Sequence, residues 1–239
     1  DAHLARYADF LEALRTSLAD GTDVAEIDAI VNTVIGWAEE IEARSLPTAI
    51  ELLSSLSDAQ VTELRRRLAA DNGELAEEEM GESIEVSQRR WQREMTSRMS
   101  RFTGRLTSAQ EDYLAAQSVR YLPERALWAE YRGRWQADLL RLLDDRADAE
   151  RFEAAFRVLA ARREDYYGSE LTQIWEHNRA LSSEVTVWLL NDLTATQRRR
   201  MDERLSDLVL ELRELASKER SRGGAPADPE GPACAVQSC

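Results

Sequence analysis

Cysteine is almost absent from this sequence, and its two copies, Cys234 and Cys239, both lie at the C-terminal end. A C-x4-C spacing after a body without cysteine fits a small oxidised loop in an exported protein, so we expect these two residues to be able to form a disulfide. The alternative is an unpaired tail, because residues 223–239 are rich in glycine and proline and are expected to be flexible.

Glycine and proline are also scarce, with 10 and 5 copies in 239 residues, and 43% of the residues are hydrophobic. This composition suits long amphipathic helices and excludes a wholly disordered chain. No apolar run approaches the roughly 18 residues that a membrane-spanning helix needs. The sequence starts directly in a helix-like pattern without the regions of a signal peptide, so the chain is either cytosolic or follows a removed leader.

Basic residues are in deficit, with 31 lysines and arginines against 45 acidic residues and a net charge of −14. Such a chain repels nucleic-acid phosphates and anionic lipid surfaces, so we do not expect a sequence-independent nucleic-acid binder. Local basic patches remain compatible with this total. Lys218 is the only lysine, and the bias towards arginine is typical of a GC-rich bacterial genome.

Signals for catalysis are few. His3 and His177 are the only histidines, and the sequence has no H-E-x-x-H, no G-x-S-x-G and no phosphate-binding glycine loop. We therefore assign no catalytic residue, no metal ligand and no cofactor, and we interpret His177 as a residue of a helix surface or core edge.

An acidic run extends from Glu74 to Glu85. We expect a solvated face whose charges repel one another. The alternative is a divalent-cation site, because Glu78 with Glu82, and Glu82 with Glu85, are neighbours on a helix face and carboxylates bind such ions.

Apolar residues recur with helical spacing, and no segment alternates with period two. We predict an all-α protein of about eight or nine amphipathic helices in an elongated or curved helical bundle. Residues 1–222 should form a single domain, with a subdivision near residue 105 left open. Pro47 should end or kink a helix, Asp71-Asn72-Gly73 should form a turn, and Ser169 should cap a helix.

Three segments share the pattern Leu-[Ser/Thr]-x-x-Gln. Each predicts a capping box, in which the hydroxyl accepts a bond from the backbone three residues on and the glutamine reaches back to the cap N–H. The cap and glutamine pairs are Ser57 with Gln60, Thr107 with Gln110, and Thr194 with Gln197. Leu56 can pack on Val61 at the first box.

The predicted helix over residues 84–105 is unusually polar but has one apolar face. Trp91, Met95, Met99 and Phe102 share that face, and Arg90 is adjacent to Trp91. We hypothesise that part of the face is an accessible groove that binds a partner helix or an unfolded client. The alternative is an ordinary interhelical seam. Core packing is expected for the tryptophans that lie among apolar residues, Trp128, Trp135, Trp175 and Trp188.

The three boxes resemble the LTxxQ motif of the Spy/CpxP-type periplasmic helical proteins, some of which are ATP-independent chaperones. Nearly the whole chain resembles a bacterial lipoprotein family that is classified as a domain of unknown function. The similar segments are Leu56 to Leu68, Leu106 to Gln110, Arg125 to Gln136, and Asn178-Arg179 leading to Leu193-Thr194.

Members of that family begin with a signal peptide and a lipidated cysteine. The resemblance therefore implies a periplasmic protein, anchored as a lipoprotein in its full-length form by an N-terminal lipid that is absent from this chain. We expect a non-enzymatic, cell-envelope binding or chaperone-like protein that holds a protein partner or unfolded client. One alternative is a structural adaptor for one specific envelope partner. The other is a hydrolase or metal enzyme, for which a buried cluster of His177 with two or more carboxylates would be the sign. The oligomeric state is not predicted.

Overall fold

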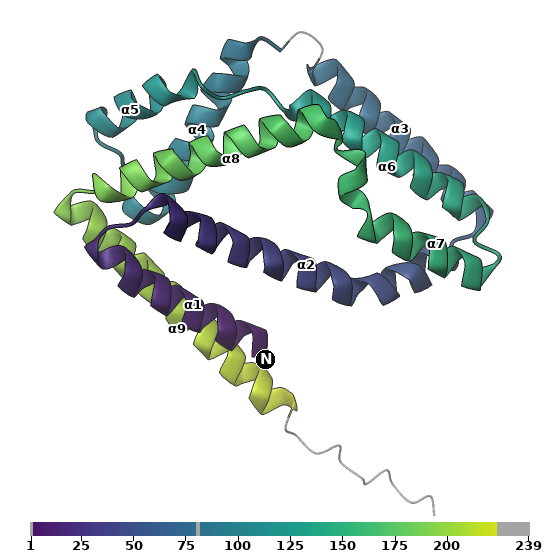
Figure 1. Ribbon diagram of the computed structural model, residues 1–239. Coiled ribbons are helices and arrows are strands. Elements are labelled where there is room, and N and C mark those ends of the chain that lie inside the picture. Colours follow the sequence, from purple (N-terminus) through teal and green to yellow (C-terminus); the bar gives the residue numbers. More distant parts are fainter. Residues whose placement is uncertain (1, 80–81, 224–239) are drawn as a thin grey trace, which may run out of the picture. The chain divides into compact units, whose positions relative to one another are not determined.

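The computed structural model describes residues 2–79 and 82–223, and Figure 1 shows their backbone. These residues form nine α-helices and two 3-10 helices, with no strand among them, so the all-α prediction is confirmed. The α-helices are α1 (Ala2–Ser17), α2 (Val24–Ser54), α3 (Asp58–Glu79), α4 (Ile84–Thr103), α5 (Ser108–Ser118), α6 (Arg125–Asp144), α7 (Ala149–Ala161), α8 (Gly168–Asn191) and α9 (Ala195–Gly223), and the 3-10 helices are η1 (Leu18–Asp20) and η2 (Arg163–Tyr166). Cys234 and Cys239 lie outside the described residues, so the disulfide stays a prediction.

Contacts between residues group the chain into two compact units. The smaller unit contains the chain up to Gly21, the segment Arg101–Gly104 and the chain from Leu193 on, and the larger unit contains the rest. We expected one domain over residues 1–222, with a subdivision near residue 105 left open. The smaller unit is discontinuous in sequence because the first and last helices pair with each other, and the number of domains stays a prediction.

Within the smaller unit, α1 and α9 pack side by side in opposite directions (Figure 1). Arg15 forms an ion pair with Asp202 at 2.8 Å, and Asp9 lies 3.5 Å from a guanidinium nitrogen of Arg213. The two helices are therefore antiparallel, because the residue nearer the end of α1 pairs with the residue nearer the start of α9. The apolar side chains buried on the two helices include Ala8, Met201, Leu205 and Val209.

Two hydrophobic clusters form the core of the larger unit. One joins α4, α5 and α8 through Trp91, Met95, Leu106, Leu114, Tyr121, Leu181, Val185 and Leu189. The other joins the end of α2 with α3, α6 and α7 through Ile50, Val61, Leu139, Leu143, Phe152, Phe156 and Leu159. Burial of apolar surface stabilises each cluster. The helices are therefore fixed by their packing in the clusters, and the linkers must connect helix ends at those positions.

Side-chain amides on α8 and α5 bind the backbone of those linkers. Asn191 accepts a hydrogen bond from Thr22 N–H at 3.0 Å and donates one to Thr22 O at 2.9 Å. Asn178 makes the same pair of bonds with the backbone of Leu122, at 3.0 and 2.8 Å. Gln110 of α5 donates to Asp192 O at 3.0 Å. Because backbone polar groups inside a fold need partners, these amides determine where the linkers run.

Three local signals in the sequence have outcomes that differ, at least in part, from the expectation. Pro47 was expected to end or kink its helix, and it does not end it, since α2 continues to Ser54 as one ribbon (Figure 1). The kink stays a prediction. The predicted turn at Asp71-Asn72-Gly73 is wrong: α3 runs through it while packing along α6, and Asn72 donates a hydrogen bond to Gln136 at 2.7 Å. Ser169 is not a cap, because α8 begins one residue earlier at Gly168, whose φ of +75° suits glycine.

All three capping boxes form. At Ser57 and Gln60 the two bonds measure 3.3 Å to the cap hydroxyl and 2.8 Å back to the glutamine. At Thr107 and at Thr194 the corresponding distances are 3.2 and 3.0 Å. The preceding leucines contribute to the core: Leu56 packs against the cluster that contains Val61, and Leu106 and Leu193 are buried.

Removing a cap hydroxyl should destabilise the protein. We expect Ser57→Ala, Thr107→Ala and Thr194→Ala each to lower the free energy of unfolding by about 1 kcal/mol, because each leaves a helix N–H without its partner. Urea unfolding followed by circular dichroism measures this. Ser108→Ala is the matched control, since Ser108 is exposed beside Thr107, and three cap variants no less stable than this control would contradict the assignment.

Candidate functional site

The apolar face of α4 points into the core of the larger unit rather than outwards. Trp91 and Met95 are only 7% and 5% exposed, and Met99 packs partly buried against the same cluster. Phe102 is 38% exposed and belongs to the smaller unit. The expected accessible groove is therefore wrong for Trp91 and Met95. The reason is tertiary: the Trp91 ring stacks on Tyr121, with centroids 5.8 Å apart.

Arg90, the charged residue of the predicted partner site, holds the segment that precedes α4. Its guanidinium pairs with Glu82, with one contact at 3.0 Å, and reaches the Ser87 hydroxyl at 3.4 Å. The hydrogen bond from Arg90 lowers the pKa of the Glu82 carboxyl. Glu82 is thus engaged in an ion pair with Arg90. The alternative interpretation of the acidic run, a divalent-cation site, required Glu82 as a ligand. The side chain of Glu78 is not among those that the structure describes.

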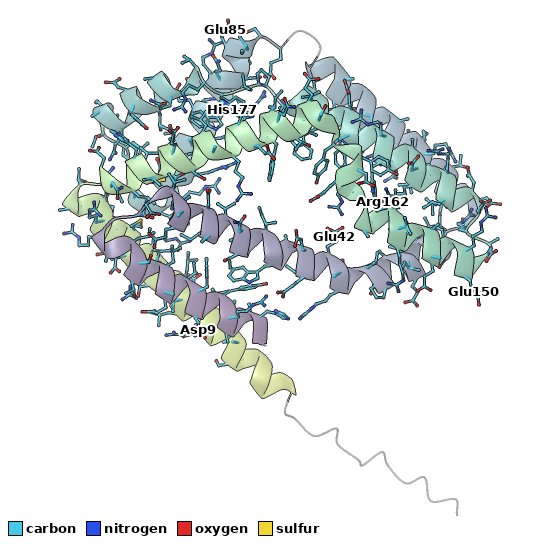
Figure 2. All side chains as sticks on the ribbon, in the orientation of Figure 1. Asp9, Glu42, Glu85, Glu150, Arg162 and His177 are labelled. Carbon is cyan, nitrogen blue, oxygen red and sulfur yellow. The ribbon has the colours of Figure 1, made fainter. Side chains whose placement is uncertain are left out.

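The linker between α5 and α6 is held by side chains from two helices. Gln88 of α4 donates to Val119 O at 2.9 Å, and Asn178 of α8 binds Leu122. His177, labelled in Figure 2, lies with Nε2 2.9 Å from Arg120 O. This exposed histidine therefore contacts a backbone carbonyl and not a buried carboxylate cluster. Among the described residues, no group of three or more His, Cys, Asp or Glu could hold a metal ion.

The clamped linker closes one side of a pocket between α4 and α8, which we call the aromatic pocket. It has a volume of about 180 Å³ and is lined by Trp91, Glu94, Met95, Arg98, Tyr121, Glu124, Trp175, Asn178, Arg179 and Ser182. Trp91, Met95, Tyr121 and Asn178 are buried, whereas Trp175 is 37% exposed. The prediction of a core position is thus wrong for Trp175, which contributes to the pocket lining.

Charges of both signs surround this pocket. Glu124 accepts bonds from the Tyr121 hydroxyl at 3.3 Å and from Asn178 at 3.2 Å. Arg179 lies 5.5 Å from the ring centre of Trp175, within the range of a cation–π contact. Burial raises the pKa of the Tyr121 phenol, and the Glu124 carboxylate raises it further. Tyr121 therefore stays protonated at neutral pH and acts as a hydrogen-bond donor.

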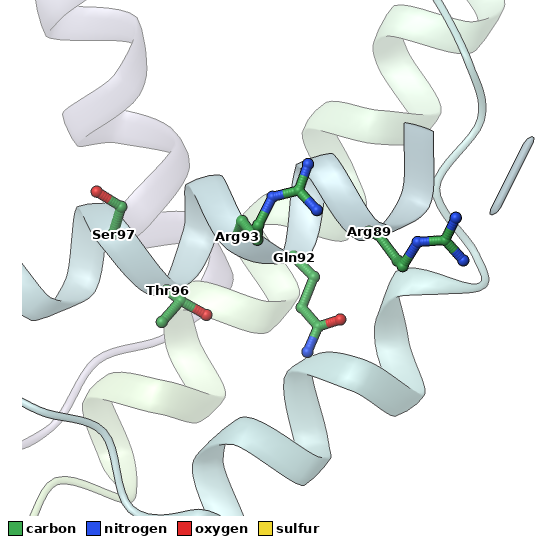
Figure 3. Close-up of a pocket in the computed structure, with 5 residues that line it drawn as sticks. All are labelled: Arg89, Gln92, Arg93, Thr96 and Ser97. Atoms are coloured by element: carbon green, nitrogen blue, oxygen red, sulfur yellow. The ribbon is translucent and has the colours of Figure 1, made fainter. Parts of the chain in front are cut away.

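A second depression lies on α4, and we call it the arginine hollow. It has a volume of about 320 Å³ and is lined by Arg89, Gln92, Arg93, Thr96 and Ser97, all shown along the helix in Figure 3. Successive residues of an α-helix advance by about 100°, so Arg89 and Arg93 are roughly half a turn around the helix from Trp91 and Met95. The two depressions thus occupy opposite faces of α4.

Sequence reasoning found the helix that carries both depressions, and two of the residues that it chose, Trp91 and Met95, line the aromatic pocket. Tyr121, Asn178 and Arg179 were missed because they join the pocket through a linker and α8, far from α4 in sequence. The Asn178-Arg179 pair was part of the family resemblance, which gave it no role. The sequence did show that arginines cluster around Trp91, and this was the available signal for the hollow.

Residues 1–172 match a family of unknown function (DUF6279), and since this is more than half of the chain, the protein belongs to that family. No curated protein and no solved structure matches the sequence. Within the described residues, none of the helices combines the length and apolar character needed to cross a bilayer.

The clamp on the linker should be important for stability. Asn178→Ala leaves the N–H and C=O of Leu122 without their side-chain partner, so we expect the free energy of unfolding to fall by about 1–3 kcal/mol. Glu176→Ala, an exposed change on the same helix, should alter it by less than about 0.5 kcal/mol. Chemical denaturation compares the two, and equal effects would show that the Asn178 bonds contribute little.

The Arg90–Glu82 pair should make stability depend on pH. Folding lowers the pKa of Glu82 below its ordinary value of 4.5, so below that pH the unfolded chain takes up a proton more readily than the folded chain. The stabilisation is therefore present above about pH 4.5 and lost as the pH falls further. Urea midpoints should be lower for Glu82→Gln than for the original chain at pH 7. The difference should shrink as the pH is lowered below 4.5, and a constant difference would contradict this account.

Proposed function

We propose that this chain, a member of a family of unknown function, is a non-enzymatic binding protein that holds one protein partner on the helical surface of its larger unit. The observation that carries the proposal is the aromatic pocket. Its buried walls come from α4, α8 and a linker that Asn178 fixes in place. A pocket that exists before binding spares a partner the cost of ordering it.

The lining of the pocket suits an anchoring side chain from a partner. Tryptophan, tyrosine and arginine contribute a large share of the binding energy in protein interfaces. Their contribution is largest where a side chain of one protein enters a pocket of the other and water is excluded. Trp91 and Tyr121 provide buried aromatic walls, and half-exposed Trp175 is positioned to be covered on binding. Arg98 and Glu94, both exposed, can select partners by charge.

A specific partner fits this site better than an unfolded client does. A chaperone that holds unfolded chains uses an adaptable and exposed apolar groove. The residues proposed for such a groove include Trp91 and Met95, which are core residues here. We therefore favour the adaptor alternative over the chaperone-like one. The hydrolase or metal-enzyme alternative depended on a buried His177 among carboxylates, and His177 instead contacts Arg120 O from the surface.

The cell envelope is the proposed location, with a lipid anchor on the full-length protein. The support is the resemblance of the three capping boxes to the LTxxQ proteins and of the longer pattern to a bacterial lipoprotein family. The partner is accordingly expected to be an envelope protein.

Photo-crosslinking in the native host tests the proposal. A photoreactive residue at Arg98, on the rim of the aromatic pocket, should crosslink to one protein, whereas the same residue at Val158, exposed on α7, should not. Trp175→Ala should reduce the affinity of that protein by about thirtyfold, as expected for an interface hot spot. Val158→Ala should leave it unchanged.

Circular dichroism must show the same helicity for both alanine variants. The proposal is contradicted if Arg98 yields no specific crosslink. It is also contradicted if the crosslinked protein binds the Trp175→Ala variant as tightly as the original chain.

A further inference from the structure

The outer face of α4 carries two arginines that form no ion pair or hydrogen bond within the described part of the chain. Arg89 and Arg93 are exposed and lie one helical turn apart. The acidic residue that Arg89 influences on this helix is Glu85, whose pKa is lowered by a hydrogen bond with Ser83 and in part by the charge of Arg89. Their neighbours on the same helix differ, because Arg90 pairs with Glu82 and Arg98 with Glu94.

These two arginines bring like charges together in a chain that is otherwise strongly acidic. The protein has 45 carboxylate side chains against 31 basic ones, so acidic partners are plentiful. Two guanidinium groups four residues apart on a helix repel each other. A bound anion would remove that repulsion.

The remaining lining residues add donors of hydrogen bonds without adding negative charge. Gln92, Thr96 and Ser97 supply an amide and two hydroxyl groups, and none of the described lining residues is acidic. A carboxylate is satisfied by a single guanidinium fork. A phosphate monoester carries about −1.5 to −2 charges and three acceptor oxygens, which matches two arginines with additional neutral donors.

We infer that the arginine hollow binds a phosphoryl group, presented either by a free phosphate compound or by a phospholipid headgroup. The site does not depend on the proposed partner protein, because it occupies the opposite face of α4 from the aromatic pocket. The net charge of −14 opposes the approach of any anion, so binding depends on these local donors and weakens as salt screens them.

Calorimetric titration with inorganic phosphate and flotation with vesicles test the inference on the same variants. The vesicles are phosphatidylcholine with and without phosphatidic acid, whose headgroup is a phosphate monoester. Arg89→Gln and Arg93→Gln should each weaken binding by about tenfold, the loss expected for one charge-assisted hydrogen bond. Arg101→Gln is the matched control, because Arg101 is exposed on the same helix outside the hollow.

The probes also distinguish the two sources of the phosphoryl group. Saturable binding of inorganic phosphate that depends on both arginines supports a free ligand. Binding only to vesicles that contain phosphatidic acid, with the same dependence, supports a headgroup. The inference is overturned if neither probe binds, or if Arg101→Gln weakens binding as much as the other two variants. Trp175→Ala should retain phosphoryl binding whether or not the partner proposal holds.

Discussion

The larger unit depends on the need of irregular backbone for hydrogen-bond partners. Seven of its helices must be joined by linkers whose N–H and C=O groups are not satisfied by helical bonds. Asn178 and Asn191 solve this with the same device, since each side-chain amide both accepts from and donates to the backbone of one linker residue. If Asn178 lost its linker, its buried side-chain amide would be left without these partners, so α8 and this linker are stabilised together.

The candidate site is a consequence of this arrangement. Asn178 and Gln88 fix the linker that carries Tyr121, and Tyr121 then stacks on Trp91 and closes the aromatic pocket. One face of α4 is thereby committed to the core, which leaves the arginines on its opposite face for solvent or a ligand. A single helix thus supplies a wall to an aromatic site and the whole lining of a basic one. The two proposals concern these two faces and can be judged separately.

Ion pairs engage many of the arginines in the described part of the chain. Most ion pairs in the described chain join arginine to acidic residues three or four positions away or on an adjacent helix, such as Arg66 with Glu63 and Arg65 with Asp144. Exposed pairs of this kind contribute little to stability, but they neutralise arginine in a strongly acidic chain. Arg89 and Arg93 form no ion pair of this kind, although, beside the hydrogen bond with Ser83, the charge of Arg89 contributes to the lowered pKa of Glu85.

The sequence by itself determined the features that depend on neighbouring residues. The helical class followed from apolar spacing, and the boxes at Ser57, Thr107 and Thr194 followed from bonds that span only three residues. The tertiary structure decided the rest. Asn72 and Gly73 stay helical because α6 is beside them, and Trp91 faces inwards because Tyr121 is held opposite it by α8. Burial, and contacts between residues more than twenty positions apart, exist only in the packed chain. A local sequence pattern could therefore identify α4 as a functional helix, but it could not decide which face of α4 is exposed.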